Sequence, residues 1–353
     1  MKEYKIAVIP GDGIGIEVVE SAIEVITKQS QNKNYTFTLK YFDWSSEYYF
    51  KHNIMMPKDG IKKLKNFDAI FLGAVGHPDI QDHITLNGLL LPIRRAFDQF
   101  ACVRPSILYP GVDSPLKNMH PYDIDLVVVR ENTEGEYANV GGFQYRDFPE
   151  EIAVQSAVFT RKGCERVIRY AFELAKTRNK NNHVTSITKS NAQGYSMTLW
   201  DRVFNEVKDD YPSIETNTLL IDAACMDFLR RPKEFDVVVA SNLFGDILTD
   251  IGAIITGSMG LASSANIDPT NNSPSMFEPT HGSAPDIAGK QIANPMAQIL
   301  TAAIMLDHLG EKDSAKELES SVKKVLEKGE TLTPDLGGQS RTNDVTDAIL
   351  SLL

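Results

Sequence analysis

The segment EFDVVVASNLFGDILTDIG, residues 234 to 252, joins a strand-like run directly to a helix-like run. Its apolar stretch from Val237 to Ala240 is typical of a strand buried on both faces of a sheet. The residues that follow read as a helix, and helices that begin where buried strands end are where open α/β sheets place ligands. The segment therefore indicates an α/β protein and a place to look for its site.

Two aspartates in the helical part raise a question of charge. Asp246 and Asp250 are four residues apart, so on a helix they share a face about one turn from each other. Their repulsion is roughly 3–4 kcal/mol at an effective dielectric constant near 20, and residues 241–252 contain no lysine or arginine. Mg²⁺ or Mn²⁺ would turn that repulsion into attraction, since both prefer oxygen ligands. The ordinary alternative is that one of the two aspartates caps the helix and the other is exposed. Asp222 in TLLIDAACMDFL is the candidate third ligand, and its ordinary alternative is also a helix cap.

Strand-like and helix-like runs alternate along most of the chain. KIAVIP precedes GIEVVESAIEVITK, in which Ile16, Val19, Ile23 and Ile26 have helical spacing, and FDAIFLGAVG and IDLVVVREN read as further buried strands. EIAVQSAVFTR alternates polar and apolar side chains, which favours an exposed antiparallel strand, and the C-terminal part reads as helices. We expect a mixed parallel and antiparallel sheet. The chain has no linker or repeat, so a domain boundary must be a crossover of the chain.

Composition narrows the class of partner. The 353 residues are 42% hydrophobic and carry a net charge of −11, which argues against nucleic acid and anionic membranes. The length suggests two domains, or one large α/β unit with an insertion. Three widely spaced cysteines without a C-x-x-C pair read as reduced core thiols, and no apolar run is long enough to span a bilayer. The N-terminal run lacks the features of a signal peptide. We expect a cytoplasmic protein.

Three arginines and a lysine–tyrosine pair are candidates for chemistry. Arg94, Arg104 and Arg130 lie in or beside apolar runs, where they are suited to bind the carboxylates of a small diacid. Each could instead form a structural ion pair. Lys189 follows a strand and Tyr137 lies in a polar loop, so both are either surface residues or acid–base groups.

Two glycine-containing segments bear on a cofactor. GDGIGIE lacks glycine at the sixth position of a dinucleotide fingerprint, where it has Ile16, and therefore reads as a tight strand-to-helix turn. FEPTHGSAPDIAGKQIANP reads as a rigid loop that a ligand can approach closely, although a plain glycine–proline connection fits as well. In that loop His281 offers a ring for stacking. Asp286 could hold two ribose hydroxyls, which favours NAD over NADP.

Taken together, GDGIG, VRPSILYPG, RENTEGEY, TKSN, SNLFGDILTDIG and FEPTHGSAPDIAGKQIANP resemble the β-decarboxylating dehydrogenases, a family that includes isocitrate and isopropylmalate dehydrogenases. The resemblance covers residues 5 to about 343. It implies an isopropylmalate dehydrogenase-like two-domain α/β fold that is not a Rossmann fold. Residues 1–100 and 257–353 would form a discontinuous NAD-binding domain. Residues 101–256 would form a central domain for substrate, metal and dimerisation, with a β arm that builds a homodimer.

The resemblance also assigns roles to residues of this chain. It implies that Asp246 and Asp250 bind Mg²⁺ or Mn²⁺ with Asp222 of a second subunit, so that the active sites are shared between subunits. It makes Tyr137 the acid and Lys189, from the partner subunit, the base in the oxidation and decarboxylation of a 2-hydroxy diacid by NAD⁺. Its substrate contacts are Arg94, Arg104, Arg130, Leu90 and Leu91, and its cofactor contacts are His281, Gly282, Ala284, Asp286 and Asn294. A monovalent cation, which parts of the family require, leaves no signature in these residues.

The choice of substrate depends on the residues before Arg94. Isocitrate dehydrogenases have a serine and an asparagine where this chain has Gly88 and Leu90, and a leucine pair disfavours a third carboxylate. RENTEGEYANVGG is most similar to the tartrate and D-malate branch, although that branch tends to have tryptophan where Asn87 stands. We expect D-malate or tartrate, with 3-isopropylmalate as the alternative and isocitrate or homoisocitrate less favoured. A non-catalytic subunit is disfavoured because the acid, the base and the three aspartates are all present.

Overall fold

The computed structural model describes all residues from 1 to 353 and divides them into two compact units. The first unit comprises Met1–Gln99, Val103–Ile124 and Gly252–Leu353, and the second comprises Phe100–Cys102 and Asp125–Ile251. The sequence-based boundaries put residues 103–124 in the central domain, whereas the structure packs them in the first unit. The contacts of residues 108–114 give the reason. Ser114 Oγ donates a hydrogen bond to the Ile255 carbonyl at 2.6 Å, and the Lys323 ammonium lies 5.8 Å from the centre of the Tyr109 ring.

The first unit contains a mixed sheet, as expected. Its strands follow the order β2-β1-β3-β12-β11-β4. They are β1 (Lys2–Gly11), β2 (Tyr35–Tyr41), β3 (Ala69–Ala74), β4 (Ala101–Ile107, which begins in the second unit), β11 (Ala265–Ile267) and β12 (Ser275–Phe277). β1 is parallel to β2 and β3, β3 is parallel to β12, and β11 is antiparallel to β12.

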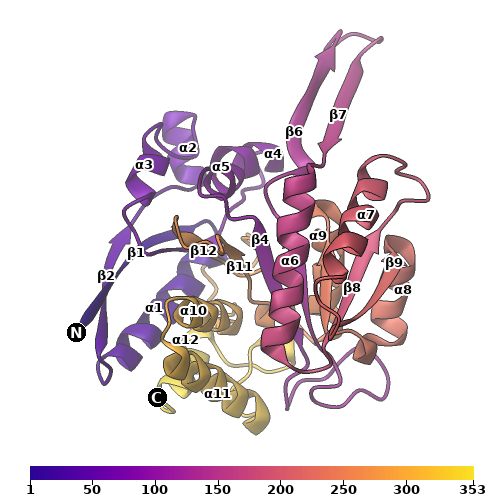
Figure 1. The fold of residues 1–353 in the computed structure, drawn as a ribbon. Coiled ribbons are helices and arrows are strands. Elements are labelled where there is room, and N and C mark those ends of the chain that lie inside the picture. The colour runs from indigo at the N-terminus through magenta and orange to yellow at the C-terminus, as the bar shows by residue number, and fades with distance from the viewer. The chain divides into compact units, whose positions relative to one another are not determined.

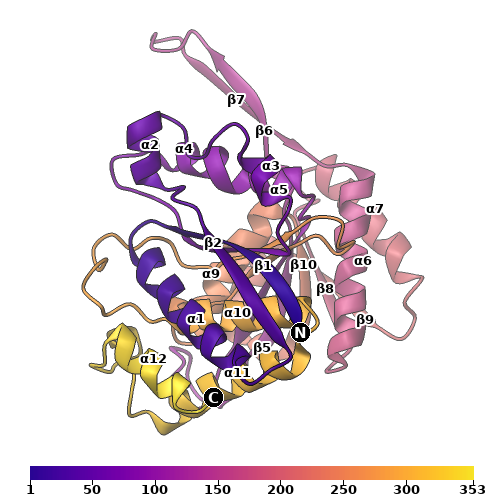
Figure 2. The same cartoon turned by 90° about the vertical axis from the view of Figure 1, so that its left-hand side faces the viewer.

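Helices pack against this sheet. They are α1 (Ile14–Ser30), α2 (Ser46–His52), α3 (Gly60–Leu64), α4 (Asp82–Thr85), α5 (Leu91–Ala96), α10 (Met296–His308), α11 (Lys312–Lys328) and α12 (Thr342–Leu350). α1 contacts β1, β2 and β3 as well as α10 and α12, and Figure 2 shows α1 with α10, α11 and α12 apart from the group α2–α5. The predicted apolar stripe of α1 fails at Ile16, which is 55% exposed. Ile14 and Val18 face inward instead and pack with Ala293.

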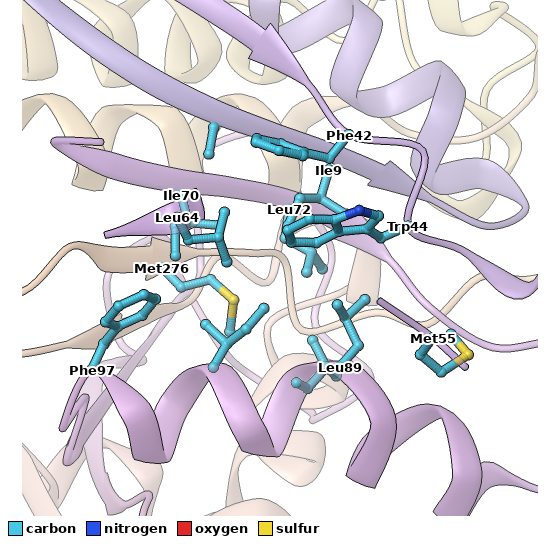
Figure 3. Packing of buried hydrophobic residues seen from close by; sticks show 13 residues of the cluster. Ile9, Phe42, Trp44, Met55, Leu64, Ile70, Leu72, Leu89, Phe97 and Met276 are labelled. Carbon is cyan, nitrogen blue, oxygen red and sulfur yellow. The ribbon is translucent and has the colours of Figure 1, made fainter. Parts of the chain in front are cut away.

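A hydrophobic core lies between the sheet and α5. Alternate residues of β1 and β3, among them Ile9, Ile70 and Leu72, point toward the helix and are fully buried. Figure 3 shows these side chains with the Trp44 ring above Leu89 and with Met276 and Phe97 beside them. This packing fixes the helix that carries Arg94.

The second unit holds a parallel sheet in the order β5-β10-β8-β9. The strands are β5 (Asp125–Glu131), β8 (His183–Thr188), β9 (Glu215–Leu220) and β10 (Val237–Ala240). The helices are α6 (Arg161–Arg178), α7 (Ser196–Lys208), α8 (Ile221–Arg230) and α9 (Asn242–Ile255, whose last residues from Gly252 belong to the first unit). β6 (Gly135–Gln144) and β7 (Ile152–Val158) form an antiparallel hairpin that projects from the unit (Figure 1). The exposed strand predicted from EIAVQSAVFTR is β7. Tyr137, expected in a loop, lies in strand β6.

The cysteines and the helices bear on two further expectations. All three cysteines are free thiols. Cys102 and Cys164 are buried, but Cys225 is only half-buried and is therefore not a full core residue. Burial raises the pKa of the Cys164 thiol to about 12. None of the helices combines the length and the apolar character needed to cross a membrane.

Candidate active site

The helix α9 begins where β10 ends, beside an arginine of the neighbouring strand. Ala240 of β10 is paired in register with Arg130 of β5, so the carboxyl ends of both strands meet at the start of α9. Gly245 lets the helix approach, because a Cβ at this position would lie 2.6 Å from Arg130 Cβ. Glycine in the FGD sequence thus has a packing reason despite its poor helix propensity.

Arg130 neutralises one of the two aspartates. Its guanidinium is buried, donates to Asn242 Oδ1 from Nε at 3.1 Å and from Nη2 at 2.6 Å, and forms an ion pair with Asp246. The Tyr137 hydroxyl donates to the other oxygen of Asp246 at 3.0 Å, and the Tyr137 ring centre lies 5.3 Å from Arg130 Cζ. The positive charge that opposes Asp246 is therefore that of Arg130 in β5. It lies outside residues 241–252, which contain no lysine or arginine.

The two aspartates remain accessible on α9. Asp246 has a side-chain exposure of 32%, and Asp250 is exposed one turn later. Glu136 of β6 accepts hydrogen bonds from the Leu243 amide at 3.1 Å and from Ser241 Oγ at 2.9 Å, which caps the helix and places a carboxylate at its positive end. The network holds α9 in position, with the Asp246 side chain partly and the Asp250 residue largely exposed to solvent.

Lys189 and Asp222 form a second charged pair in the same unit. Lys189 follows β8 directly, Asp222 lies in the first turn of α8, and the two side chains make an ion pair. The Lys189 ammonium lowers the pKa of the Asp222 carboxyl below its usual value. Within one chain, no group of three aspartate, glutamate, histidine or cysteine side chains gathers as a metal site would require.

The other two arginines belong to the first unit. Arg94 in α5 forms an ion pair with Glu278, with Nη2 at 2.6 Å from Oε1 and side-chain exposures of 7% and 8%. Asn266 Nδ2 donates to the same oxygen at 2.7 Å. Arg104 is buried in β4. The first unit therefore holds two of the three predicted carboxylate-binding arginines, and the second holds Arg130.

The leucine pair expected to contact the substrate lies just before Arg94. Both Leu90 and Leu91 are buried, and Leu90 belongs to the same hydrophobic core as Leu89 and Trp44. A π-helical turn, Leu86–Leu90, joins α4 to α5, a feature frequent at functional sites. Asn87 in this turn is half-buried, and its amide donates to the His83 carbonyl at 2.8 Å.

A pocket of about 410 Å³ in the first unit collects three of the predicted cofactor contacts. His281, Ala284 and Asn294 line it together with Ile14 and Asp335. Gly282 lines a second pocket of about 530 Å³, and Asp286 is exposed on the loop between Ala284 and Ile287 without lining either. The volume of the first pocket, about 410 Å³, falls in the range of small-molecule binding sites.

The polar end of this pocket has an unsatisfied histidine atom. His281 Nε2 is buried and has no hydrogen-bond partner, and burial lowers the pKa of the ring below its usual value. The imidazole is therefore neutral at neutral pH and free to make one further hydrogen bond or a stacking contact. Asp335 accepts a hydrogen bond from Asn294 Nδ2 at 3.0 Å and so fixes that amide.

Several functional neighbours were missed by sequence reasoning. They are Glu278 beside Arg94, Asn242 beside Arg130, Glu136 at the start of α9 and Asp335 in the pocket. RENTEGEY offered no local signal for Glu136, because the Leu243 amide that it caps lies 107 residues further along the chain. TLTPDLGG likewise offers no signal for Asp335, since it reads as an ordinary turn.

The chain belongs to the isocitrate/isopropylmalate dehydrogenase family, whose profile matches residues 5–349. It is an oxidoreductase, a decarboxylating dehydrogenase acting on a CH–OH group.

Two curated relatives and one solved structure make the similarity specific. The chain is 52% identical over 355 residues to a Bacillus subtilis protein named "Probable tartrate dehydrogenase/decarboxylase", covering 100% of this chain and 99% of the relative. It is 47% identical over 360 residues to the Escherichia coli "D-malate dehydrogenase [decarboxylating]", covering 100% and 99%. The crystal structure of isocitrate dehydrogenase from Methylococcus capsulatus matches with a TM-score of 0.89 at 37% identity, over 99% of each chain.

Proposed function

We propose that this protein catalyses the oxidative decarboxylation of D-malate or tartrate with NAD⁺ and Mg²⁺ or Mn²⁺. The observation that carries the proposal is the network on α9, where Arg130, Tyr137 and Asp246 contact one another at the carboxyl end of the second unit's sheet. It supplies a carboxylate-binding cation, a proton donor and oxygen ligands in one place. The names of the relatives that match along the whole chain support the substrate class.

The pocket of the first unit fits NAD. Its walls combine apolar side chains such as Ile14 and Ala284 with the unpartnered His281 Nε2, which suits a heteroaromatic ring. Asp286 lies on the loop that forms one wall, and an exposed carboxylate repels the 2′-phosphate of NADP. When bound, NAD⁺ supplies the hydride acceptor. We assign His281, Gly282, Ala284, Asp286 and Asn294 to its binding.

The donor set on α9 fits a hard divalent cation. Asp246 and Asp250 offer carboxylate oxygens one turn apart, with no thiol or imidazole in the set. A bound divalent cation supplies electrophilic polarisation of the substrate oxygens. Two ligands are few for such an ion, and the chain brings no third acid to them. We therefore assign the third position to Asp222 of a second copy.

The chain's own residues account for binding and proton transfer. Arg94, Arg104 and Arg130 hold the carboxylates of the malate-like part of the substrate. Lys189 accepts the hydroxyl proton during oxidation, and Tyr137 returns a proton to the carbon from which CO₂ departs. Tyr137 is suited to this because its hydroxyl is held at 3.0 Å from Asp246 while the cationic Arg130 lies over its ring.

A homodimer completes the site in this proposal. Lys189 and Asp222, the residues assigned to the opposite subunit, already form a pair on one surface of the chain and can enter a partner's site together. Large apolar side chains are exposed on the β6–β7 hairpin and on α8 and α9: Val140, Phe143, Ile152, Val154, Met226, Leu229 and Ile247. Exposed apolar groups in such numbers mark an association surface.

Initial NADH formation with Mn²⁺ and K⁺ present tests the proposal across D-malate, the tartrates, 3-isopropylmalate and isocitrate. We expect D-malate or a tartrate to give the highest kcat/KM. A clear preference for 3-isopropylmalate would instead assign the enzyme to leucine biosynthesis and contradict the substrate proposal. Absence of turnover with every diacid would favour a non-catalytic subunit.

A further inference from the structure

The GDGIGIE segment, which lacks the dinucleotide fingerprint, is hydrogen-bonded to three other segments of the first unit. The buried Asp12 carboxylate accepts hydrogen bonds from the Ser46 amide at 2.8 Å and from the Gly76 amide at 2.9 Å. The Ile14 amide donates to the Ser283 carbonyl at 2.8 Å, which ties the start of α1 to the loop that carries Asp286. One end of that loop is thus anchored at Ser283.

Glu17 anchors the other end. Its side chain lies in the first turn of α1, the residue is 7% exposed, and its Oε1 accepts a hydrogen bond from the Gly289 amide at 2.6 Å. Its second oxygen, Oε2, is buried without a hydrogen-bond partner. A buried carboxylate that makes a single hydrogen bond is costly to retain, so the bond to Gly289 calls for a reason.

The loop between the two anchors depends on them. Ala284 has a φ of 40°, a left-handed conformation that an alanine adopts only at a cost, and Asp286 and Gly289 are exposed. Apolar contacts of Ala284, Ile287 and Ala288 with Ile14 and Val18 hold the inner side of the loop. These contacts do not involve Asp286, so the loop backbone determines where its carboxylate points. That backbone is hydrogen-bonded to α1 at Ser283 and at Gly289.

We infer that Glu17 is a positioning residue of the cofactor site: its bond to the Gly289 amide holds the 284–289 loop in the conformation that presents Asp286 to the ribose of a dinucleotide. This inference rests on the proposed NAD⁺ site. The competing role is a purely structural one, in which an acid in the first turn only stabilises α1.

Four variants separate these roles. Glu17→Asp shortens the side chain by one carbon, keeps the charge and withdraws the acceptor from Gly289, whereas Glu17→Gln keeps the length and an acceptor oxygen but removes the charge. Glu17→Ala removes both. Glu24→Ala, at an exposed position of the same helix, is the matched control. Thermal unfolding of each variant without cofactor shows which of them retain the fold.

The first measurement is hydrogen exchange at the Gly289 amide in the cofactor-free protein, and the second is the Kd of NAD⁺. In Glu17→Asp and Glu17→Ala we expect exchange to accelerate at least about tenfold and the Kd to rise about tenfold, with kcat at saturating NAD⁺ changed less than about twofold. Glu17→Gln is expected to stay near wild type in both. Glu24→Ala should change neither.

Each contrary result has a distinct meaning. Wild-type exchange at Gly289 in Glu17→Asp would overturn the inference, as would faster exchange with an unchanged Kd. A Glu17→Gln variant as impaired as Glu17→Ala would also overturn it, because the charge rather than the bond would then matter. If the wild-type protein itself binds no NAD⁺, the proposed function fails, and the inference fails with it; the wild-type titration alone shows this.

Discussion

Arg94 in the first unit and the α9 aspartates in the second show two ways of holding charged groups. Arg94 and Glu278 are almost fully buried, with a further bond from Asn266. Asp246 is paired with Arg130 but one-third exposed, and Asp250 is exposed. The charges of the Arg94–Glu278 pair are buried and oppose each other within the first unit. The carboxylates of α9 in the second unit are partly or fully exposed, and we propose that they bind a divalent cation.

The same contrast holds for apolar side chains. Near Arg94, Leu89 is buried in the hydrophobic core against the sheet (Figure 3), and Leu90 is buried in the same core. On the β6–β7 hairpin, by contrast, Phe143 and Val154 are exposed. Monomeric proteins rarely leave such surfaces uncovered. The second unit is therefore the one that we expect to depend on a second copy of the chain.

The largest expected effect on stability concerns the buried pair of the first unit. Glu278→Ala leaves Arg94 buried without its counter-charge, and removing one partner of a buried ion pair costs about 3–5 kcal/mol. Asp222→Asn, which breaks the exposed pair with Lys189, should leave the free energy of unfolding nearly unchanged. Chemical unfolding of both variants measures the difference. Equal losses would show that the two units do not differ in this way.

The next effect concerns catalysis through α9. Asp250→Asn keeps the size of the side chain but weakens an oxygen ligand, so we expect activity at limiting Mn²⁺ to fall by more than about 100-fold, since even outer-shell changes at metal sites cost 10–100-fold. The fold should be intact by circular dichroism because Asp250 is exposed. Normal activity of this variant at limiting Mn²⁺ would refute the metal assignment.

A smaller effect is expected from the hairpin. Phe143→Asp places a charge on an exposed apolar strand, which should weaken self-association and make specific activity fall on dilution. Phe50→Asp, at an exposed position of α2 in the first unit, is the control. Sedimentation velocity measures the mass of both variants. An unaltered dimer in Phe143→Asp would remove the hairpin from the interface.

The smallest effect is a pH dependence of the first unit. Burial lowers the pKa of His308 and of His281 below the ordinary value of 6.5. As the pH falls below that value, the two histidines bind protons in the unfolded chain but stay neutral in the folded chain. The free energy of unfolding therefore decreases. His308→Gln removes one of these groups and should flatten the decline between pH 7 and about 5.5 in urea unfolding. An unchanged slope would show that His308 does not contribute.

Local sequence patterns predicted the parts of the site that depend on neighbouring residues. The VVVA run and the aspartate spacing indicated β10 and α9, and the position of Arg130 at a strand end followed from the apolar run before it. The partners of Arg94 and Asp246 could not be predicted in this way. Glu278 and Arg94 are 184 residues apart in the chain, and only folding brings them together.

The helix before Arg94 shows a second limit. The resemblance implied that Leu90 and Leu91 contact the substrate, and the structure shows that both are buried. The segment that contains Leu90 is a π-helical turn, Leu86–Leu90, which adds one residue to a helical turn. A one-residue change of helical phase leaves no local signal in composition, so the face of such a helix cannot be read from spacing alone.

The central claim is that each active site combines α9 of one chain with Lys189 and Asp222 of another, and subunit complementation tests it most directly. Lys189→Ala and Asp250→Asn are each expected to be inactive as homodimers. Refolded together at equal amounts, they should recover about a quarter of wild-type activity, because half of the dimers would be hybrids with one intact site of two. Absence of recovery in a mixture shown to contain hybrid dimers would contradict the shared site. It would indicate that Lys189, Asp222 and the α9 aspartates of one chain act in the same active site.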